Sequence, residues 1–295
     1  MHTILGLPTQ VLFGQLTLGL INGAFYALLS LGLAVIFGLL NIVNFSHGAL
    51  YMMGAFAGWI LLTVLGIGYW WALLLAPVIV GLFGMAIERL MIARLYRLDP
   101  IYGLLLTFGL ALIIQGVFRN LYGVSGLPYA IPQALTGARN LGFMVLPNYR
   151  AWVIVASLAV SLATWFTIEK TSLGATLRAA TENPTMVSAF GINVPRLVTL
   201  TYGFGVGLAA FAGVLAAPIY SVNPNMGADV IIVVFAVVVI GGMGSILGSV
   251  ITGFALGLCE GLTKVLYPQG SSTVIFVIMI AVLLVKPSGL FGRTA

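Results

Sequence analysis

Long apolar stretches alternate with short polar connections along the whole sequence. Nine such stretches can be recognised, at residues 10–41, 47–66, 70–96, 101–119, 150–169, 197–220, 227–243, 246–266 and 272–286. A helix needs about 20 apolar residues to cross the hydrocarbon core of a bilayer. The stretches are continuous, without the alternation of membrane-barrel strands, so they predict helices. The pattern therefore predicts an all-α polytopic membrane protein, a single domain over residues 1–295 with about nine spans and eight or ten as alternatives.

The first apolar stretch is unusually long. At ~1.5 Å per residue, a helix over residues 10–41 is about 48 Å long, which exceeds one perpendicular span. We expect this helix to tilt strongly, to break near Gly32, or to consist of two short segments. The composition agrees with membrane insertion, with 61% hydrophobic and 6% charged residues. No lysine or arginine precedes Arg89, so the basic region of a secretory signal peptide is missing.

The basic residues lie in the connections between spans and indicate an orientation. With nine spans the termini lie on opposite faces. An external N-terminus and a cytoplasmic C-terminus place most lysines and arginines in the cytoplasm, as membrane proteins prefer. The cytoplasmic set is then Arg89, Arg94, Arg97, Lys170, Arg178, Arg196, Lys286 and Arg293, and the external set is Arg119, Arg139, Arg150 and Lys264. The net charge of +6 is thus a topology signal and does not indicate nucleic-acid binding.

A short polar cluster, NIVNFSHGAL, interrupts the apolar sequence from Asn41 onward. Its motif VNFSHGA returns as VNPNMGA at residues 222–228, with the same Val, Asn, Gly and Ala. Downstream of the two copies, matching residues share the same spacing: Gly81 with Gly253, and Glu88 with Glu260. The copies have opposite orientations in the nine-span topology, so the motif predicts an inverted repeat. Glycines at small-residue spacing within the spans predict close helix packing.

The repeat divides the chain into a first half-repeat at 9–119, a connecting region at 120–196 and a second half-repeat at 197–290. The connecting region holds an external loop, one span and a cytoplasmic loop. Inverted-repeat transporters place their pathway at the repeat interface, beside interrupted helices. The pathway candidates are therefore the polar residues of the two copies, Asn41, Asn44, Ser46, His47, Asn223 and Asn225.

These polar residues also have structural interpretations. Asn44 and Asn223 are positioned to cap the helices that follow them. Capping and pathway lining are compatible, because an exposed helix N-terminus still offers backbone donors. For His47 we favour a structural hydrogen bond over a role in proton relay.

The cytoplasmic loop at residues 170–197 contains its own helix signals. Asn183 fits an N-cap, Pro184 the first helical position and Gly191 the left-handed residue after the helix end. They predict a helix from Pro184 to Phe190 whose exposed face carries Met186, Val187 and Phe190. A helix of barely two turns is not stable alone. Its apolar face therefore predicts a partner protein or, alternatively, contact with lipid headgroups.

Several stretches resemble known transport proteins. RAATENPTMVSAFGI resembles the cytoplasmic coupling segment of ABC importer permeases. GLINGAFYALLSLGLAVIFGLLNIVNFSHGALYMMGAF, IERLMIARLYR and VVVIGGMGSILGSVITGF look like segments of the LivH-type branched-chain amino acid permeases, and the resemblance runs from about residue 10 to 290. The chain departs from that family at residues 93–98, ARLYRL, where relatives usually carry Arg-Pro-Leu. The resemblance puts the ATPase contact on Ala179, Ala180, Glu182 and Gly191, and the helix signals add Asn183, Pro184, Met186 and Phe190.

The resemblance implies a larger assembly in the bacterial inner membrane. A second, LivM-like permease subunit would pair with this chain in the lipid, on LivG-like and LivF-like ATPases, and a periplasmic binding protein would deliver the substrate. The expected function is ATP-driven alternating access for branched-chain or other small hydrophobic amino acids. We find no phosphate-loop motif in the sequence, so ATP and Mg would bind to the ATPases. We expect no metal, cofactor or nucleic acid on this chain.

Three other functions compete with this one. A urea or short-amide ABC permease fits the same apolar sequence. An ion-coupled secondary transporter usually keeps acidic groups at mid-membrane, whereas Asp229 and Glu260 fall near the ends of their spans. An intramembrane hydrolase would need a base within reach of Ser46, and the adjacent His47 points in a different direction. We therefore do not expect an enzyme.

Overall fold

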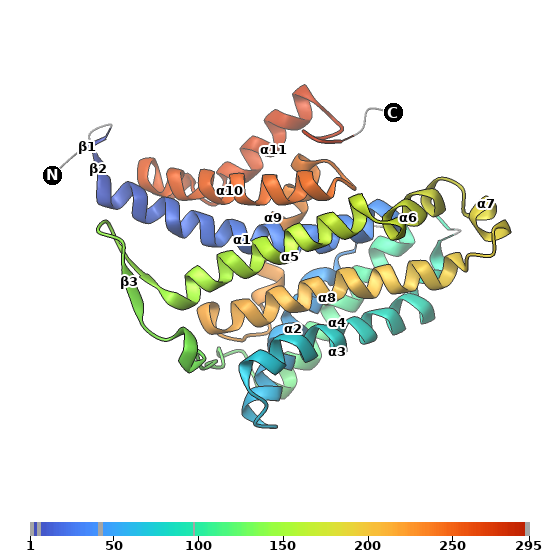
Figure 1. Cartoon of the computed structure of the whole chain (residues 1–295), viewed down its shortest axis with the longest axis horizontal. Helices are drawn as coiled ribbons and strands as arrows, with labels where there is room; N and C mark the ends of the chain where they lie inside the picture. Colours follow the sequence, from blue (N-terminus) through green and yellow to red (C-terminus); the bar gives the residue numbers. More distant parts are fainter. Residues whose placement is uncertain (1–2, 5–6, 41–43, 97, 293–295) are drawn as a thin grey trace. The chain divides into compact units, whose positions relative to one another are not determined.

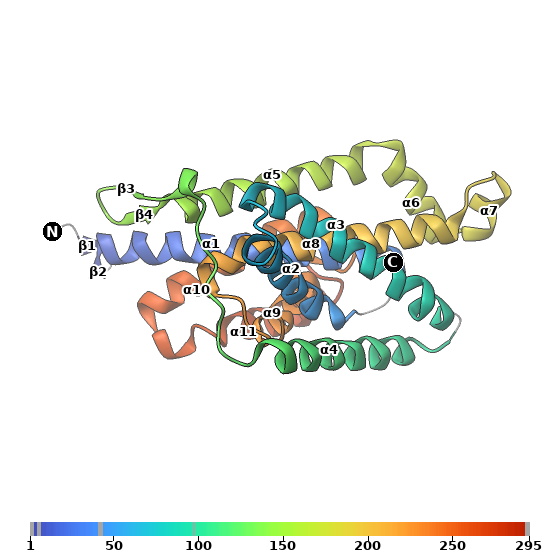
Figure 2. The same ribbon diagram turned by 90° about the horizontal axis from the view of Figure 1, so that it is seen from below.

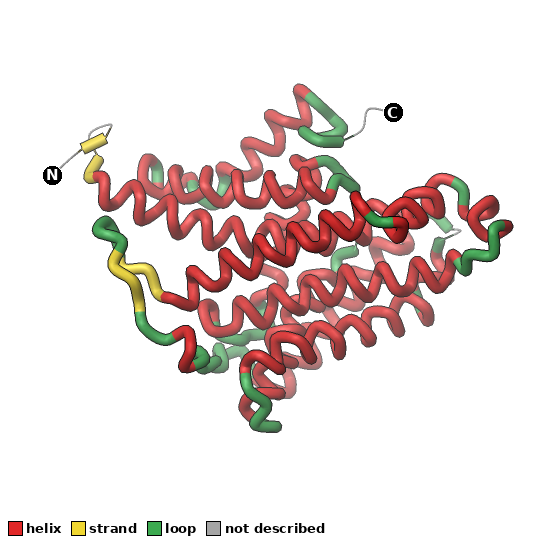
Figure 3. Tube along the Cα trace, in the orientation of Figure 1, coloured by secondary structure: helices red, strands yellow, loops and turns green. Residues whose placement is uncertain are grey.

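A computed structural model describes residues 3–4, 7–40, 44–96 and 98–292 of the chain, and these are mostly helical (Figure 1). The helices are α1 (Thr9–Leu40), α2 (Ser46–Thr63), α3 (Tyr69–Leu90), α4 (Pro100–Tyr122), α5 (Asn148–Lys170), α6 (Ser172–Glu182), α7 (Pro184–Ala189), α8 (Val194–Tyr220), α9 (Met226–Gly241), α10 (Ile246–Leu266) and α11 (Val274–Val285). Short 3-10 helices are η1 (Ile92–Leu95), η2 (Gln133–Leu135) and η3 (Pro268–Gly270). Two antiparallel pairs, β1 (Thr3–Ile4) with β2 (Leu7–Pro8) and β3 (Ala138–Asn140) with β4 (Val145–Pro147), supply the strands of the described residues (Figure 3).

The predicted spans correspond to helices. Within the described part of the chain, each of the nine apolar stretches contains one α-helix, and six helices are long and apolar enough to cross a membrane: α1, α3, α4, α5, α8 and α10. Helices α9 and α11 are apolar but shorter, with 16 and 12 residues. The prediction of an all-α polytopic membrane protein is confirmed.

Helix α1 runs without interruption for 32 residues, so the predicted alternatives of a break near Gly32 or two short segments are wrong. Gly32 serves packing instead. A Cβ atom added there would lie 2.6 Å from the carbonyl oxygen of Gly205 in α8. Only a glycine allows the two helix backbones to approach this closely, which is how small residues hold membrane helices together.

One compact unit comprises Met1–Ser30, Ala130–Ser161 and Val233–Ala295. Within it, α10 packs on the first part of α1 through glycines of both helices. A Cβ atom on Gly253 would lie 2.6 Å from the backbone nitrogen of Ala27, and Gly257 lies directly against Gly19 and Gly23. Beside this contact, buried residues of α9, α10 and α11 form an apolar core that includes Val237, Leu256 and Ile275.

The other compact unit comprises Leu31–Tyr129 and Leu162–Ile232. Helices α2 and α3 both pack on α8, and α2 also contacts α3 and α4 (Figure 1). Gly81 of α3 lies against Gly203 of α8, and Gly84 lies against Val206. The predicted close packing through glycines is thus present in both units.

Each unit combines segments from both predicted half-repeats. In the second unit, α3 from the first half packs on α8 from the second half. In the first unit, α10 from the second half packs on α1 from the first half. The matching glycines Gly81 and Gly253 lie in these two helix contacts. Each unit therefore contains a helix contact that joins the two predicted halves.

Two of the regions of secondary structure that were not predicted adjoin α5 in the sequence (Figure 2). The β3–β4 hairpin precedes α5, and α6 follows it after Thr171. The sequence of α6, SLGATLRAATE, is rich in good helix formers. Its only large apolar side chains are Leu173 and Leu177, which is why a search for continuous apolar stretches misses it.

Candidate functional site

The first half-repeat is interrupted between α1 and α2 at the buried residue Asn44. Its Oδ1 accepts hydrogen bonds from the Ser46 backbone N–H at 3.0 Å and the Ser46 hydroxyl at 2.5 Å. Its Nδ2 donates to the Tyr202 hydroxyl of α8 at 2.9 Å. Asn44 therefore forms an Asx turn that fastens the start of α2 to α8. The N-cap position belongs to Phe45, which makes no capping bond, so direct capping by Asn44 is wrong by one residue.

The second half-repeat is interrupted between α8 and α9 by the same turn. The Oδ1 of Asn223 accepts a hydrogen bond from the Asn225 backbone N–H at 3.0 Å. Helix α9 begins at Met226, so Asn223 also lies outside the cap position. The side-chain oxygen of Asn225 accepts bonds from Gln115 Nε2 at 3.0 Å and Arg119 Nη2 at 2.8 Å, both on α4. The sequence motif that occurs twice thus forms the same local turn twice.

The chain enters the second turn through a strained residue. Ser221 has a φ angle of +61°, in a region that residues with a side chain rarely adopt. Two backbone hydrogen bonds between Leu127 and Val222, at 2.8 and 2.9 Å, hold the neighbouring backbone in place. Such strain persists only where surrounding contacts fix it, and it is often found at functional positions.

The equivalent glycines of the two motifs, Gly48 and Gly227, touch one another. A Cβ atom on Gly48 would lie 2.6 Å from the carbonyl oxygen of Gly227, and one on Gly227 would overlap the carbonyl group of Gly48. Each glycine thus contacts the backbone of the other. Reciprocal contact between equivalent residues is expected where a two-fold axis relates two segments.

The remaining pathway candidates have different surroundings. Ser46 and His47 are fully buried, and the His47 ring packs against Gly32, where an added Cβ atom would lie 3.0 Å from its Cε1. Asn41 lies outside the described residues. The structure thus brings Asn44 and Ser46 together at one turn and Asn223 and Asn225 together at the other.

A cavity of about 220 Å³ lies beside the two glycines, between α2, α4 and α9. Its walls are mostly apolar, with one amide side chain: Phe45, Met52, Phe108, Leu112, Gln115 and Ile231. A mostly apolar pocket with few polar groups is the usual form of a small-molecule site. Sequence reasoning missed Gln115 and Phe108, because nothing in the apolar stretch of α4 distinguishes its cavity-facing side.

The loop at residues 170–197 contains the short helix that its sequence predicts. Asn183 accepts a hydrogen bond from the Met186 backbone N–H at 2.9 Å, and Pro184 is the first residue of α7. Gly191 has a φ angle of +83°, as expected after a helix end. Phe190 is 80% exposed and Met186 60% exposed.

Val187 was predicted to be exposed, and this is wrong. It is buried, and α7 packs against both α6 and α8. A helix of six residues cannot stand alone, so it places one apolar side chain on its own protein and leaves the others outside.

The other predicted coupling residues lie at the end of α6. Ala179 and Glu182 are exposed, and Ala180 is half-buried. Arg178 fixes α6 to the end of α5, because its Nη1 donates to the carbonyl oxygen of Ile168 at 2.8 Å and lies 3.6 Å from Glu169 Oε2. The α6–α7 segment is thus an anchored projection with an exposed apolar tip.

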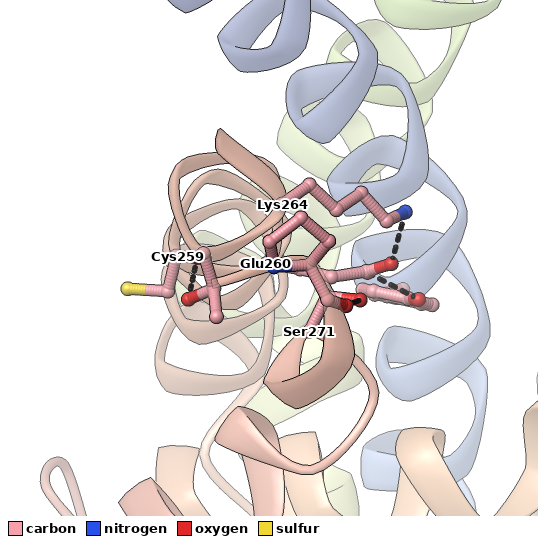
Figure 4. A network of polar contacts seen from close by, with 7 residues as sticks. Cys259, Glu260, Lys264 and Ser271 are labelled. Carbon is pink, nitrogen blue, oxygen red and sulfur yellow. Dashed lines mark hydrogen bonds and ion pairs between the residues drawn. The ribbon is translucent and has the colours of Figure 1, made fainter. Parts of the chain in front are cut away.

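Two buried carboxylates lie at equivalent positions of the half-repeats. Glu260 of α10 accepts a bond from the Tyr26 hydroxyl at 2.8 Å and pairs with Lys264 at 2.6 Å (Figure 4). Glu88 of α3 accepts bonds from the Tyr96 hydroxyl at 2.6 Å and the Thr199 hydroxyl at 2.5 Å. Removal from water and the bond to Glu88 raise the pKa of Tyr96 above its usual range, so it remains a neutral donor at physiological pH.

The fold and these features define a class: a polytopic helical membrane protein with a mostly apolar cavity between its helices. The family model described as "Branched-chain amino acid transport system / permease component" matches residues 15–283. The chain therefore belongs to this family of transport permeases and is a permease component, not an enzyme.

Individual relatives agree with the family assignment. The permease protein LivH of the high-affinity branched-chain amino acid transport system of Escherichia coli K12 is 30% identical over 96% of this chain and 95% of its own length. The corresponding protein BraD of Pseudomonas aeruginosa is 30% identical over 95% of each chain. A more distant match is the E. coli permease protein LivM, 25% identical over 91% of this chain and 68% of LivM. No solved structure matches the chain significantly.

Proposed function

We propose that this chain is one of two permease subunits of an ABC importer that carries branched-chain amino acids across the bacterial inner membrane. The family and the printed names of LivH and BraD support the substrate class. The likeness to both LivH and LivM supports a pair of related permeases. The N-terminus is periplasmic and the C-terminus cytoplasmic in this proposal.

The reciprocal contact of Gly48 and Gly227 is the observation that supports an alternating-access mechanism. Two interrupted helices start at this contact, and the cavity of about 220 Å³ lies beside it. Transporters with inverted repeats move one repeat against the other around such a site. The apolar lining suits a branched side chain, and Gln115 supplies a polar group for the amino acid backbone. Asn44 and Asn223 then act by fixing the turns from which α2 and α9 begin.

Coupling to ATP hydrolysis takes place at the tip of α7. Met186 and Phe190 present an exposed apolar surface, and Arg178 ties the segment to α5. An ATPase that grips this surface can therefore move the membrane helices behind it. ATP and Mg are bound by the ATPases, and a periplasmic binding protein delivers the substrate.

The substrate class is tested with radiolabelled leucine. The chain is reconstituted in proteoliposomes with the second permease and the ATPases encoded beside it, and the binding protein is added outside. ATP-dependent uptake of leucine, unaffected by collapse of ion gradients, is the expected result. Uptake of urea in place of leucine would assign a short-amide permease. Uptake driven by an ion gradient without ATPases would instead overturn the ABC assignment.

The coupling surface is tested with Phe190→Ser. We expect a loss of at least about tenfold in ATPase recovery from detergent, because an exposed aromatic anchor at an interface contributes about 2 kcal/mol or more. The matched control is Val145→Ser, which alters an exposed apolar residue on the β3–β4 hairpin. Equal recovery by both variants would remove α7 from the interface.

A further inference from the structure

A second, larger cavity of about 810 Å³ lies where α3 ends, between η1 and the first turn of α8. Its charged lining residues are Glu88, Arg89, Arg94 and Arg196, and its apolar wall includes Ala93, Val194 and Val198. The transport mechanism above makes no use of this cavity. It therefore requires a separate explanation.

Among the described residues, the three arginines have no acidic partner. Arg89, Arg94 and Arg196 are exposed, and none forms an ion pair or side-chain hydrogen bond with another residue that the structure describes. Glu88 is the one acidic lining residue, and hydroxyl groups of Tyr96 and Thr199 occupy its two oxygens. Positive charge thus exceeds negative charge in the cavity.

The cavity lies at a membrane boundary. Helix α3 ends at Leu90, α8 begins at Val194, and α4, which begins at Pro100, contacts η1. Three spans therefore have an end at this level. Leu90, next to Arg89 in the chain, and Ile101, in the first turn of α4, are large, apolar and exposed. A polar headgroup pocket thus adjoins a surface suited to acyl chains.

We propose that this cavity binds the phosphate headgroup of an anionic phospholipid such as phosphatidylglycerol. Guanidinium groups bind phosphate oxygens through paired hydrogen bonds. Basic pockets between spans are the usual sites for anionic headgroups. The acyl chains lie along the exposed apolar residues at the ends of α3 and α4. This inference does not depend on the substrate or on the ATPases.

The site also adjoins the coupling segment. Asn193 lines the cavity and caps α8, since its Oδ1 accepts a hydrogen bond from the Arg196 backbone N–H at 3.1 Å. Two residues before it, Gly191 ends α7. A bound headgroup would therefore lie against the backbone that connects α7 to α8.

The test uses the purified full-length chain in nonionic detergent. Phosphatidylglycerol and phosphatidylcholine with identical acyl chains are titrated separately, and bound lipid is counted by native mass spectrometry. We expect phosphatidylglycerol to bind more tightly. The triple variant Arg89→Gln, Arg94→Gln, Arg196→Gln is expected to lose affinity on the order of a hundredfold, with about fivefold from each arginine. The control Arg139→Gln removes one exposed arginine from β3 and is expected to change nothing.

Several outcomes would overturn the proposal. One is wild-type affinity for phosphatidylglycerol in the triple variant, and another is equal binding of phosphatidylcholine to the wild type. If inorganic phosphate raises the thermal stability of the chain as much as phosphatidylglycerol does, the cavity is a site for free anions. The triple variant could also bind lipid as the wild type does but recover less ATPase in the absence of lipid. That result would assign the arginines to a protein interface. If the triple variant does not fold, Arg94→Gln alone is expected to show the fivefold loss.

Discussion

The ends of α3 and α10 carry a glutamate at equivalent positions of the two half-repeats, and its surroundings differ. Glu260 has a tyrosine hydroxyl and a lysine one turn further along its own helix. Glu88 has two hydroxyl donors and makes no ion pair with a described residue. Both carboxylates are buried, at 8% and 1% exposure. Both glutamates thus accept hydrogen bonds, but within the described residues only Glu260 has a counter-ion.

This difference means that the cation at the end of α10 is already paired, whereas the arginines at the end of α3 can still bind an anion. At Glu260 the nearby cation is already paired, so the site is complete within the chain. At Glu88 the hydroxyl groups satisfy the carboxylate, and the nearby arginines remain open to an external anion. A buried charge needs hydrogen bonds or a paired charge to be tolerated. Glu260 uses a paired lysine and Glu88 uses hydroxyl groups, so only the end of α3 keeps arginines for the proposed headgroup site.

The largest expected difference between the two ends concerns their glycine contacts. A Cβ atom on Gly253 would lie 2.6 Å from the Ala27 backbone, whereas one on Gly81 would lie 3.0 Å from the Gly203 carbonyl oxygen. We expect Gly253→Ala to destabilise the protein by about 1–3 kcal/mol, and Gly81→Ala by clearly less, because overpacking against backbone cannot relax. Thermal unfolding in detergent measures both. Equal losses would show that the two helix contacts are equally tight.

The spans could be predicted from sequence because the bilayer sets both the length and the composition of a helix. Local signals were equally readable: Asn183, Pro184 and Gly191 mark α7 with short-range rules, and the structure follows them. Even the motif that occurs twice, at Asn44 and Asn223, corresponds to one repeated turn. Features that depend on the nearest few residues were therefore predictable.

Features that depend on distant partners were not predictable. Glu88 meets Thr199 across 111 residues of sequence, and Gln115 meets Asn225 across 110. No spacing rule connects such pairs, because they arise when α3 packs on α8 and when α4 meets the turn before α9. The exposure of Val187 was mispredicted for the same reason, since its burial follows from the packing of α7 on its neighbours.

The second comparison removes one hydroxyl donor from each carboxylate. Tyr96→Phe leaves Glu88 with Thr199 alone, whereas Tyr26→Phe leaves Glu260 with Lys264. We expect Tyr96→Phe to cost about 1–3 kcal/mol, the usual loss for a buried acceptor deprived of a partner. Tyr26→Phe is expected to cost less, because the lysine still neutralises the charge. Unfolding midpoints of the two variants decide this, and a larger loss for Tyr26→Phe would reverse the assignment of the two ends.

The smallest expected effect comes from the ion pair itself. Lys264 follows Glu260 by four residues, and the side chains are 38% and 11% exposed. The lysine end of the pair is open to solvent and the Tyr26 hydroxyl still donates to Glu260 in its absence, so Lys264→Gln is expected to lower stability by only about 1 kcal/mol. The effect should shrink as salt rises from about 0.01 to 1 M, because the screening length falls from about 30 to 3 Å. Unfolding in nonionic detergent across this range measures it.

Lys286→Gln is the matched control for the ion pair. The Lys286 amino group donates to the Leu290 carbonyl oxygen at 2.9 Å, so the effect of this variant should be nearly independent of salt. If both variants respond to salt alike, Lys264 acts through general surface charge and Glu260 is no better neutralised than Glu88. If only Lys264→Gln responds, the pair is a specific contact. At Glu88 the hydroxyl groups of Tyr96 and Thr199 take the place of such a pair.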